Sequence, residues 1–420
     1  MGGIRRRRGA NARYRPRGVI RHAAGLIGPT AAMASHVALE DNAGLRARRL
    51  AEAARDRVGQ RLRPSRARMR ALTALPGGRF EWRDVPAPPP PGALAATVHP
   101  IAVATCDLDR VVGLGASPFA LPLHFGHECV AEVLHVGERV TSVRPGQRVV
   151  VPFQISCGEC GACAQGRTGN CERVPPISMY GFGIGGGHWG GALSDQLHVP
   201  FADAMLVPLP EGIDPAAAAS VADNVSDGYR HVAPHAPVLL ERDPDMEILI
   251  LAGVARRPVL SASVPLYAGL VARALGVRHV RLVDSRRAVR EQAERLGLEP
   301  LRPPDLRRHR PAPLVVDVSG SPAGLRRALE HTARDGVCSS AGGLHRTARI
   351  PTGLLYGRNA TYHVARTHVR TLIPQVLELM STGRLDPAPV TTHLGRIDDA
   401  PASISHHVLR GQATKTVLVA

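Results

Sequence analysis

The stretch "CGECGACAQGRTGNC" at residues 157–171 places four cysteines in one short, glycine-rich segment. Cys157, Cys160 and Cys163 follow one another at steps of three, and Cys171 comes eight residues later. Thiolates at this spacing can converge on one ion, because the intervening glycines let the backbone turn tightly. Zn²⁺ suits four thiolates, and a closed four-sulfur site is structural. We therefore predict a structural zinc site.

Two other interpretations of these cysteines are weaker. The chain has seven cysteines, an odd number, and its first residues contain no clean apolar region typical of a secretory signal. Disulfides are rare where thiols are kept reduced. A thioredoxin-like redox pair needs one C-x-x-C near a helix start, whereas two overlap here. We expect reduced thiols and a cytoplasmic location.

A second set of candidate ligands precedes this segment. "VATCDLDRVV" contains Cys106, and "HFGHECVAEVLHVGERVTSVRPGQRVVV" contains His127 and Glu128. The second stretch is rich in valine and interrupted by glycine, which predicts short strands joined by tight turns and hence a small β-barrel. A cysteine and a histidine can both bind zinc. Each alone is more often a core residue, but followed by four clustered cysteines they indicate a second metal site.

These motifs resemble a known family. Cys106, the triplet Gly126-His127-Glu128, "VRPGQRVVV" and the four-cysteine segment occur in this order in zinc-dependent medium-chain alcohol dehydrogenases. The resemblance covers about residues 69–420. It implies an α/β fold with a partly open, GroES-like β-barrel domain and a Rossmann domain built on a doubly wound parallel sheet.

The resemblance also implies the domain order. We expect a basic extension at 1–68, a GroES-like catalytic domain at 69–224, a Rossmann cofactor-binding domain at 225–366, and a C-terminal return to the catalytic domain at 367–420. The strand-like alternation that begins at Met69 marks the expected start of the folded part.

In this family a third protein ligand completes the catalytic zinc site, and the matching stretch here is "SVADNVSDGYRHV". The family often has cysteine at this position, whereas this chain has Asp223, whose carboxylate is also a zinc ligand. The implied catalytic set is Cys106, His127 and Asp223, with Glu128 as a neighbouring or exchanging ligand. Asp109 is expected to accept the histidine N–H. The alternative role for Asp223 is a helix N-cap.

The pattern departs from the family two residues after the zinc cysteine. Relatives usually have serine or threonine there to pass on the alcohol proton, whereas this chain has Leu108. Asp107, His124 and His188 are candidates for another relay, although each is more often an ordinary surface or packing residue.

A strand, a helix and a second strand in the later part of the chain predict a Rossmann unit. They are "MEILILAGV", "PLYAGLVARALGV" and "RHVRLVD". Gly253 is the only glycine of the expected fingerprint, because residues 254–265 contain none and Pro265 replaces the last one. Lost glycines impair close approach to a pyrophosphate. The sequence therefore indicates a weakened hold on the cofactor.

Asp284 ends the second strand, where an acidic side chain binds the adenosine ribose and favours NAD over NADP. Arg286 and Arg287 follow and could accommodate a 2′-phosphate, so NADP stays possible. Lys415, the only lysine of the chain, falls where relatives place a basic contact to the cofactor phosphates. Its alternative role is a salt bridge in a strand.

The expected function is hydride transfer between an alcohol, or an aldehyde or ketone, and a nicotinamide cofactor, with two zinc ions per chain and a homo-oligomer as the expected assembly. One alternative is a family member with weak cofactor binding and little activity. The other is a zinc-bearing nucleic-acid-binding module, since residues 1–68 contain 17 arginines and only four acidic residues. That segment has few aromatics for base stacking. The sequence contains no run of 18 apolar residues, so we expect no membrane-spanning helix.

Overall fold

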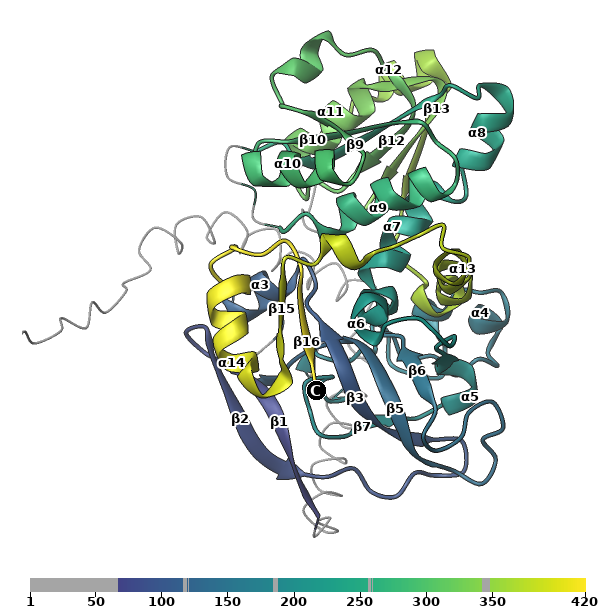
Figure 1. The fold of residues 1–420 in the computed structure, drawn as a ribbon. Helices are drawn as coiled ribbons and strands as arrows, with labels where there is room; N and C mark the ends of the chain where they lie inside the picture. The colour runs from purple at the N-terminus through teal and green to yellow at the C-terminus, as the bar shows by residue number, and fades with distance from the viewer. Residues whose placement is uncertain are drawn as a thin grey trace, which may run out of the picture.

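The structure, a computed structural model, describes residues 67–420 except 116–118, 120, 184–187, 256–257, 259 and 342–347. The basic extension expected at 1–68 lies almost wholly outside the described residues. The described chain forms two halves, with a parallel sheet and its helices in one and antiparallel strands in the other (Figure 1). The expected combination of a GroES-like barrel domain with a Rossmann domain is confirmed.

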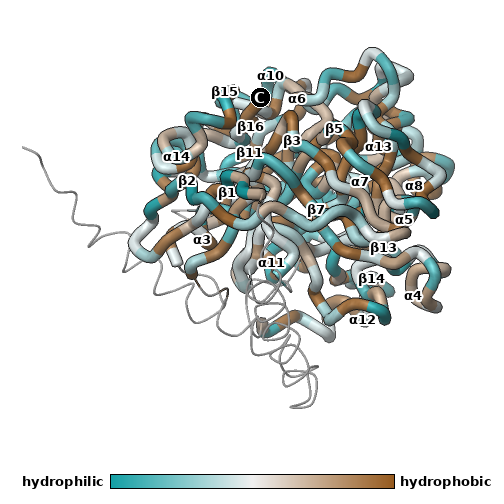
Figure 2. Tube along the Cα trace, turned by 90° about the horizontal axis from the view of Figure 1, so that it is seen from below, coloured by the Kyte–Doolittle hydropathy of each residue, from teal (hydrophilic) through white to brown (hydrophobic). Residues whose placement is uncertain are grey.

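The first half is a barrel-like body whose strands pair antiparallel, except for one parallel pair at the C-terminal edge. In the part of the chain that the structure describes, one of its sheets has the order β2-β1-β4, and the other has the order β15-β16-β3-β5-β6-β8 with β7 beside β3. The early strands are β1 (Arg68–Leu75), β2 (Arg79–Pro86), β3 (Ala96–Ala104), β4 (Leu123–His124), β5 (Glu128–Val136), β6 (Arg148–Val151), β7 (Leu197–Val199) and β8 (Val207–Pro208). Most residues of β3 and β5 are buried, and Figure 2 shows hydrophobic stretches along both strands.

Short helices and turns connect these strands. They are α3 (Asp109–Gly113), α4 (Gly161–Ala164), η1 (Thr168–Asn170), α5 (Ala202–Met205), α6 (Pro215–Ala218) and η3 (Ala219–Ala222). The chain then enters α7 (Asn224–Val232) and α8 (Ala236–Arg242), which lead into the second half. In α7, Gly228 allows close packing on a neighbouring helix, because a Cβ there would lie 2.7 Å from the backbone nitrogen of Ala268.

The second half is built on a parallel sheet with the order β11-β10-β9-β12-β13-β14 among the described residues. Its strands are β9 (Glu247–Gly253), β10 (His279–Asp284), β11 (Glu299–Leu301), β12 (Ala312–Asp317), β13 (Thr332–Ser340) and β14 (Thr361–Val364). Its helices are α9 (Ser263–Ala274), α10 (Arg287–Arg295), η4 (Asp305–Arg308), α11 (Pro322–Glu330) and α12 (Thr352–Arg358). The apolar run of β9 is buried at the centre of the sheet, as parallel strands usually are. The strand order reverses between β9 and β12, and ligands of such sheets bind beyond the strand ends there.

The C-terminal part returns to the first half, shown in yellow in Figure 1. It consists of α13 (Val369–Ser381), η5 (Ala388–Val390), β15 (His393–Arg396), η6 (Ile397–Asp399), α14 (Ala400–Ser403), η7 (Ile404–Val408) and β16 (Thr416–Val419). β16 pairs antiparallel with β3, so the closing strand lies beside the strand that precedes Cys106. Every helix in the described part of the chain is too short or too polar to cross a lipid bilayer.

Candidate active site

The four cysteines of the glycine-rich segment bring their sulfur atoms together, all within 4.8 Å of one another. Cys160 Sγ accepts the backbone N–H groups of Cys163 at 3.5 Å and Glu172 at 3.4 Å. Cys171 Sγ accepts the N–H of Cys157 at 3.4 Å. Such bonds favour thiolates, and the Glu172 N–H lowers the pKa of Cys160 to about 6. The sulfur set fits one tetrahedral zinc ion.

A second cluster joins Cys106, His127, Glu128 and Asp223, with one ligand atom of each within 4.8 Å of the others. The pairing of β3 with β5 places Ala104 opposite Glu128, so the turn after β3 meets the start of β5. The last member comes from the junction between η3 and α7. Three separate segments therefore supply one set of thiol, imidazole and carboxylate groups.

His127 lies at the centre of this second cluster. Its two ring nitrogens are buried and have no hydrogen-bond partner in the described residues. Nδ1 lies 3.6 Å from Asp109 Oδ1, and Nε2 lies 3.5 Å from Asp223 Oδ2. Burial alone would lower the pKa of His127, but the two carboxylates raise it to about 9. A buried imidazole whose nitrogens have no hydrogen-bond partner is typical of a metal ligand in a structure without the metal ion.

The second cluster carries an excess of acidic groups. Burial, together with Asp223 and Glu128, raises the pKa of the Cys106 thiol well above its ordinary value. Asp109 is also buried here and accepts the N–H of Cys106 at 2.8 Å. Buried anionic groups are stable only when paired or bound to a cation. The residues present therefore fit a divalent metal ion, and the mixed sulfur, nitrogen and oxygen set suits zinc.

Lys415 is fully buried against the second cluster. Its Nζ donates to both carboxylate oxygens of Glu128, at 2.7 and 3.0 Å. Burial disfavours the charged amine, yet Glu128 raises the pKa of Lys415 above its ordinary value. In the amide orientation that satisfies both of its ends, Asn224 donates to Asp223 and Glu128 and accepts from Lys415, at 3.0 to 3.3 Å. The expected contact of Lys415 with cofactor phosphates stays a prediction; its present partner is Glu128.

The cofactor-side residues meet at the end of the central strands. Asp284 is fully buried, and Arg286 donates to its carboxylate from Nε at 2.9 Å and Nη2 at 2.7 Å. Arg286 Nη1 also donates to the Leu260 carbonyl at 2.8 Å. Gly253 lies against this pair, because a Cβ there would come within 2.6 Å of an Asp284 oxygen. The structure thus brings Gly253 and Asp284 together but covers the carboxylate with the chain itself.

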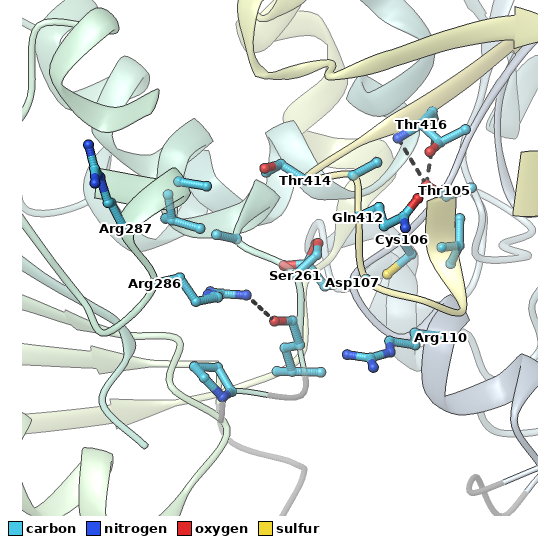
Figure 3. A pocket seen from close by; sticks show the side chains of 18 residues that line it. Thr105, Cys106, Asp107, Arg110, Ser261, Arg286, Arg287, Gln412, Thr414 and Thr416 are labelled. Atoms are coloured by element: carbon cyan, nitrogen blue, oxygen red, sulfur yellow. Dashed lines mark hydrogen bonds between the residues drawn. The ribbon is translucent and has the colours of Figure 1, made fainter. Parts of the chain in front are cut away.

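A cavity of about 340 Å³ lies between the two halves of the molecule, with Cys106 in its wall (Figure 3). Arg110, Arg286 and Arg287 give its lining a positive character, and Asp107 is the one acidic side chain among the described residues that line it. The cleft therefore joins the second cluster to the carboxyl end of the parallel sheet, where a dinucleotide would bind.

The three candidates for a proton relay lie in different places. Asp107 accepts hydrogen bonds from residues at the start of α9. His124 lies in β4 beside the Thr73 hydroxyl, and His188 is exposed; the described lining of the cavity contains neither. Leu108 offers no ionisable group. Of the three candidates, Asp107 is the one in the described lining of the cavity, and its carboxylate is bonded to the start of α9.

Comparisons with known proteins agree with this geometry. Residues 92–211 match the alcohol dehydrogenase GroES-like domain family. A probable zinc-binding alcohol dehydrogenase from Mycobacterium tuberculosis is 28% identical over 79% of this chain and 83% of its own length. A medium-chain reductase/dehydrogenase from Acremonium is 30% identical over 61% of this chain and 91% of its own. The alcohol dehydrogenase of Thermus sp. ATN1 superposes with a TM-score of 0.74 and 27% identity, covering 84% of this chain and 99% of that one.

The fold and the two clusters define a zinc-dependent medium-chain dehydrogenase, and the chain belongs to this family. It is a zinc-dependent oxidoreductase of the NAD(P)-dependent alcohol dehydrogenase class, with a small-molecule substrate. The comparisons give no support to the nucleic-acid-binding alternative.

Sequence reasoning missed the polar network behind the second cluster. The sequence predicts no role for Asn224, and its position next to Asp223 is the only signal that points to it. The sequence gives a stronger signal at Lys415, because this position has the only lysine in a chain whose other basic residues of this kind are all arginine. The pairing of Lys415 with Glu128 joins residues 287 positions apart, so no local pattern predicts it.

Proposed function

We propose that Cys106, His127 and Asp223 hold a catalytic zinc ion and that the four-cysteine cluster holds a structural one, two per chain. The observation that carries this proposal is the convergence of ligand atoms from three separate segments within 4.8 Å, around a histidine whose ring nitrogens have no hydrogen-bond partner in the described residues. When bound, the catalytic zinc supplies a Lewis acid that favours loss of an alcohol proton, and the nicotinamide ring supplies the hydride acceptor.

The residues of the chain then have distinct tasks. Asp109 orients the His127 ring and the backbone of Cys106. Lys415 holds both oxygens of Glu128, which keeps that carboxylate beside the ligand set as a neighbouring or exchanging group. The cavity between the two halves receives the alcohol or carbonyl substrate next to Cys106 and the dinucleotide beyond it.

We also propose a cytoplasmic location and a homo-oligomeric state. The thiols of both clusters must stay reduced to bind metal, which favours a reducing compartment. β14 is the last strand of the parallel sheet in the described residues, and it carries the exposed Val364 beside an α12 helix with the exposed Tyr356. An open sheet edge with exposed apolar side chains favours pairing with a second copy.

Metal analysis and a cofactor titration on the purified full-length chain test the proposal. We expect two zinc ions per chain and quenching of protein fluorescence, or enhancement of NADH fluorescence, as NADH is added. One zinc per chain would contradict the catalytic site. Two zinc ions without NADH binding would favour the alternative of a family member with weak cofactor binding.

A further inference from the structure

Asp107 bridges the two halves of the molecule. It follows Cys106 in the first half, and its carboxylate accepts the hydroxyls of Ser261 and Ser263 in the second half. The same carboxylate accepts the backbone N–H groups of Ser263 and Val264, both at 3.4 Å. Asp107 is buried, with 8% of its surface exposed, and Figure 3 shows it beside Ser261 in the cleft.

The donors that Asp107 uses are those that a phosphate would use. They lie just before and at the start of α9, the helix that follows the central strand β9. A helix start offers free N–H groups and a positive field. In a Rossmann unit the dinucleotide pyrophosphate binds at this helix start. Arg110, Arg286 and Arg287 also line this cavity, with Arg286 paired to Asp284 and Arg287 paired to Glu291, whereas Asp107 adds a negative charge to the lining.

We propose that Asp107 is an internal competitor for the phosphate site, so that a dinucleotide binds only when this carboxylate leaves the start of α9. The proposal rests on the proposed function. A carboxylate and a pyrophosphate cannot share the same donors, and two anions in contact repel each other. The apparent dissociation constant of the cofactor is therefore the intrinsic one divided by the fraction of molecules in which Asp107 has left the site.

Asp107 thereby sets the cofactor affinity of this chain, in addition to the missing glycines of the loop. The contact also ties the first half of the molecule to the second. When the dinucleotide binds, its pyrophosphate replaces the Asp107 carboxylate as the acceptor of the same hydrogen bonds. No additional donors are needed.

NADH titrations of the zinc-loaded full-length chain test this inference. We expect Asp107→Asn and Asp107→Ala to lower the dissociation constant by about tenfold or more, which equals 1.4 kcal/mol. Inorganic pyrophosphate should raise the melting temperature of Asp107→Ala more than that of the wild type, because it needs only the phosphate donors. Asp107→Asn removes the negative charge but keeps the size of the side chain and one oxygen acceptor. The zinc content of each variant shows whether the second cluster is intact.

Asp203→Ala is the matched control. Asp203 also accepts two hydroxyls and two backbone N–H groups, from Thr141 and Ser142, but lies outside the described cavity lining. Its removal should leave NADH affinity unchanged. If the wild type binds NADH and the Asp107 variants bind it equally or more weakly, the contact of Asp107 with α9 does not compete with the cofactor. The inference is then wrong. If neither binds NADH with both zinc ions present, the inference and the proposed function both fail.

Discussion

At the residue scale, Asp223 is the position where two roles compete. It occupies the N-cap position of α7, but its side chain accepts no capping hydrogen bond from the described helix. Its carboxylate instead points to His127 and belongs to the second cluster. The geometry thus favours a ligand over a cap, and the two roles predict different effects on metal content.

We predict that Asp223→Ala removes one zinc per chain and lowers activity by orders of magnitude, because the site loses a ligand and the alcohol its Lewis acid. Asp223→Cys should restore the zinc, since thiolate is also a good ligand. Asp214 is the control, because its side chain does cap a helix, accepting the Ala216 N–H at 3.1 Å. Asp214→Ala should keep both zinc ions. Two zinc ions in Asp223→Ala would show that the residue is not a ligand.

Lys415 and Glu128 form the second residue-scale test. Both are fully buried, so removal of one partner leaves an unpaired charge. We predict that Lys415→Met lowers the free energy of unfolding by about 3–5 kcal/mol, measured by chemical denaturation. Adding Glu128→Gln should recover much of the loss.

The exposed pair of Arg70 and Asp398 offers a comparison, with side chains 53% and 63% exposed. Asp398→Asn should cost no more than about 1 kcal/mol. An equally small cost for Lys415→Met would mean that the buried pair contributes little.

At the element scale, the four-cysteine segment contains little regular structure besides α4 and η1. A segment that is rich in glycine and short of apolar residues buries too little apolar surface to offset the conformational entropy that it loses on folding. We predict that Cys163→Ser loses about one zinc per chain and lowers the melting temperature, because the tetrahedron is incomplete. Cys338→Ser, in the buried strand β13, should keep both ions. Zinc analysis of the two variants decides the role of the segment, and an unchanged zinc content in Cys163→Ser would contradict it.

α7 contains a buried histidine, His231, that we expect to make the fold sensitive to acid. Burial, reinforced by Arg230, lowers the pKa of His231 well below 6.5, and its Nδ1 lies 2.8 Å from the Ser339 hydroxyl. The unfolded chain binds a proton near pH 6.5 that the folded chain excludes. The stabilising contribution is therefore present above that pH and is lost as the pH falls below it.

We predict that His231→Gln weakens the pH dependence of the unfolding free energy between pH 7 and 5, by up to about 1.4 kcal/mol per pH unit. Denaturation curves at several pH values measure this difference, with the exposed His279→Gln as the control. An equal pH dependence in wild type and His231→Gln would show that His231 is not excluded from protonation.

At the scale of the whole molecule, cofactor choice depends on both halves, because the cavity lies between them. Arg286 already donates to Asp284 and to the Leu260 carbonyl, and Arg287 donates to Glu291 at 2.6 Å. Both arginines near the adenosine end are thus engaged within the chain. Because both arginines are already paired within the chain, neither is free to bind a 2′-phosphate, and we therefore expect NAD to be the preferred cofactor.

We predict that NADH binds at least about tenfold more tightly than NADPH, a difference of about 1.4 kcal/mol. Fluorescence titrations with both nucleotides measure it without knowledge of the alcohol. Arg287→Ala should leave the ratio unchanged, because this exposed side chain is not expected to contact a phosphate. A clear preference for NADPH, lost in Arg287→Ala, would show that the arginine accommodates the 2′-phosphate.

The sequence by itself determined the four-cysteine cluster, because ligand types at short, regular spacings are local information. The family, the fold class and the second set of ligand candidates followed from the resemblance of its motifs to zinc-dependent medium-chain alcohol dehydrogenases. The strand, helix and strand around Gly253 were also predictable, since their apolar periodicity is local. Only the tertiary structure decided which partner each buried charge finds. Lys415 pairs with Glu128, and Asp107 reaches the start of α9 in the other half. Each of these contacts joins groups through packing and burial, whose energies depend on the assembled fold and not on sequence spacing.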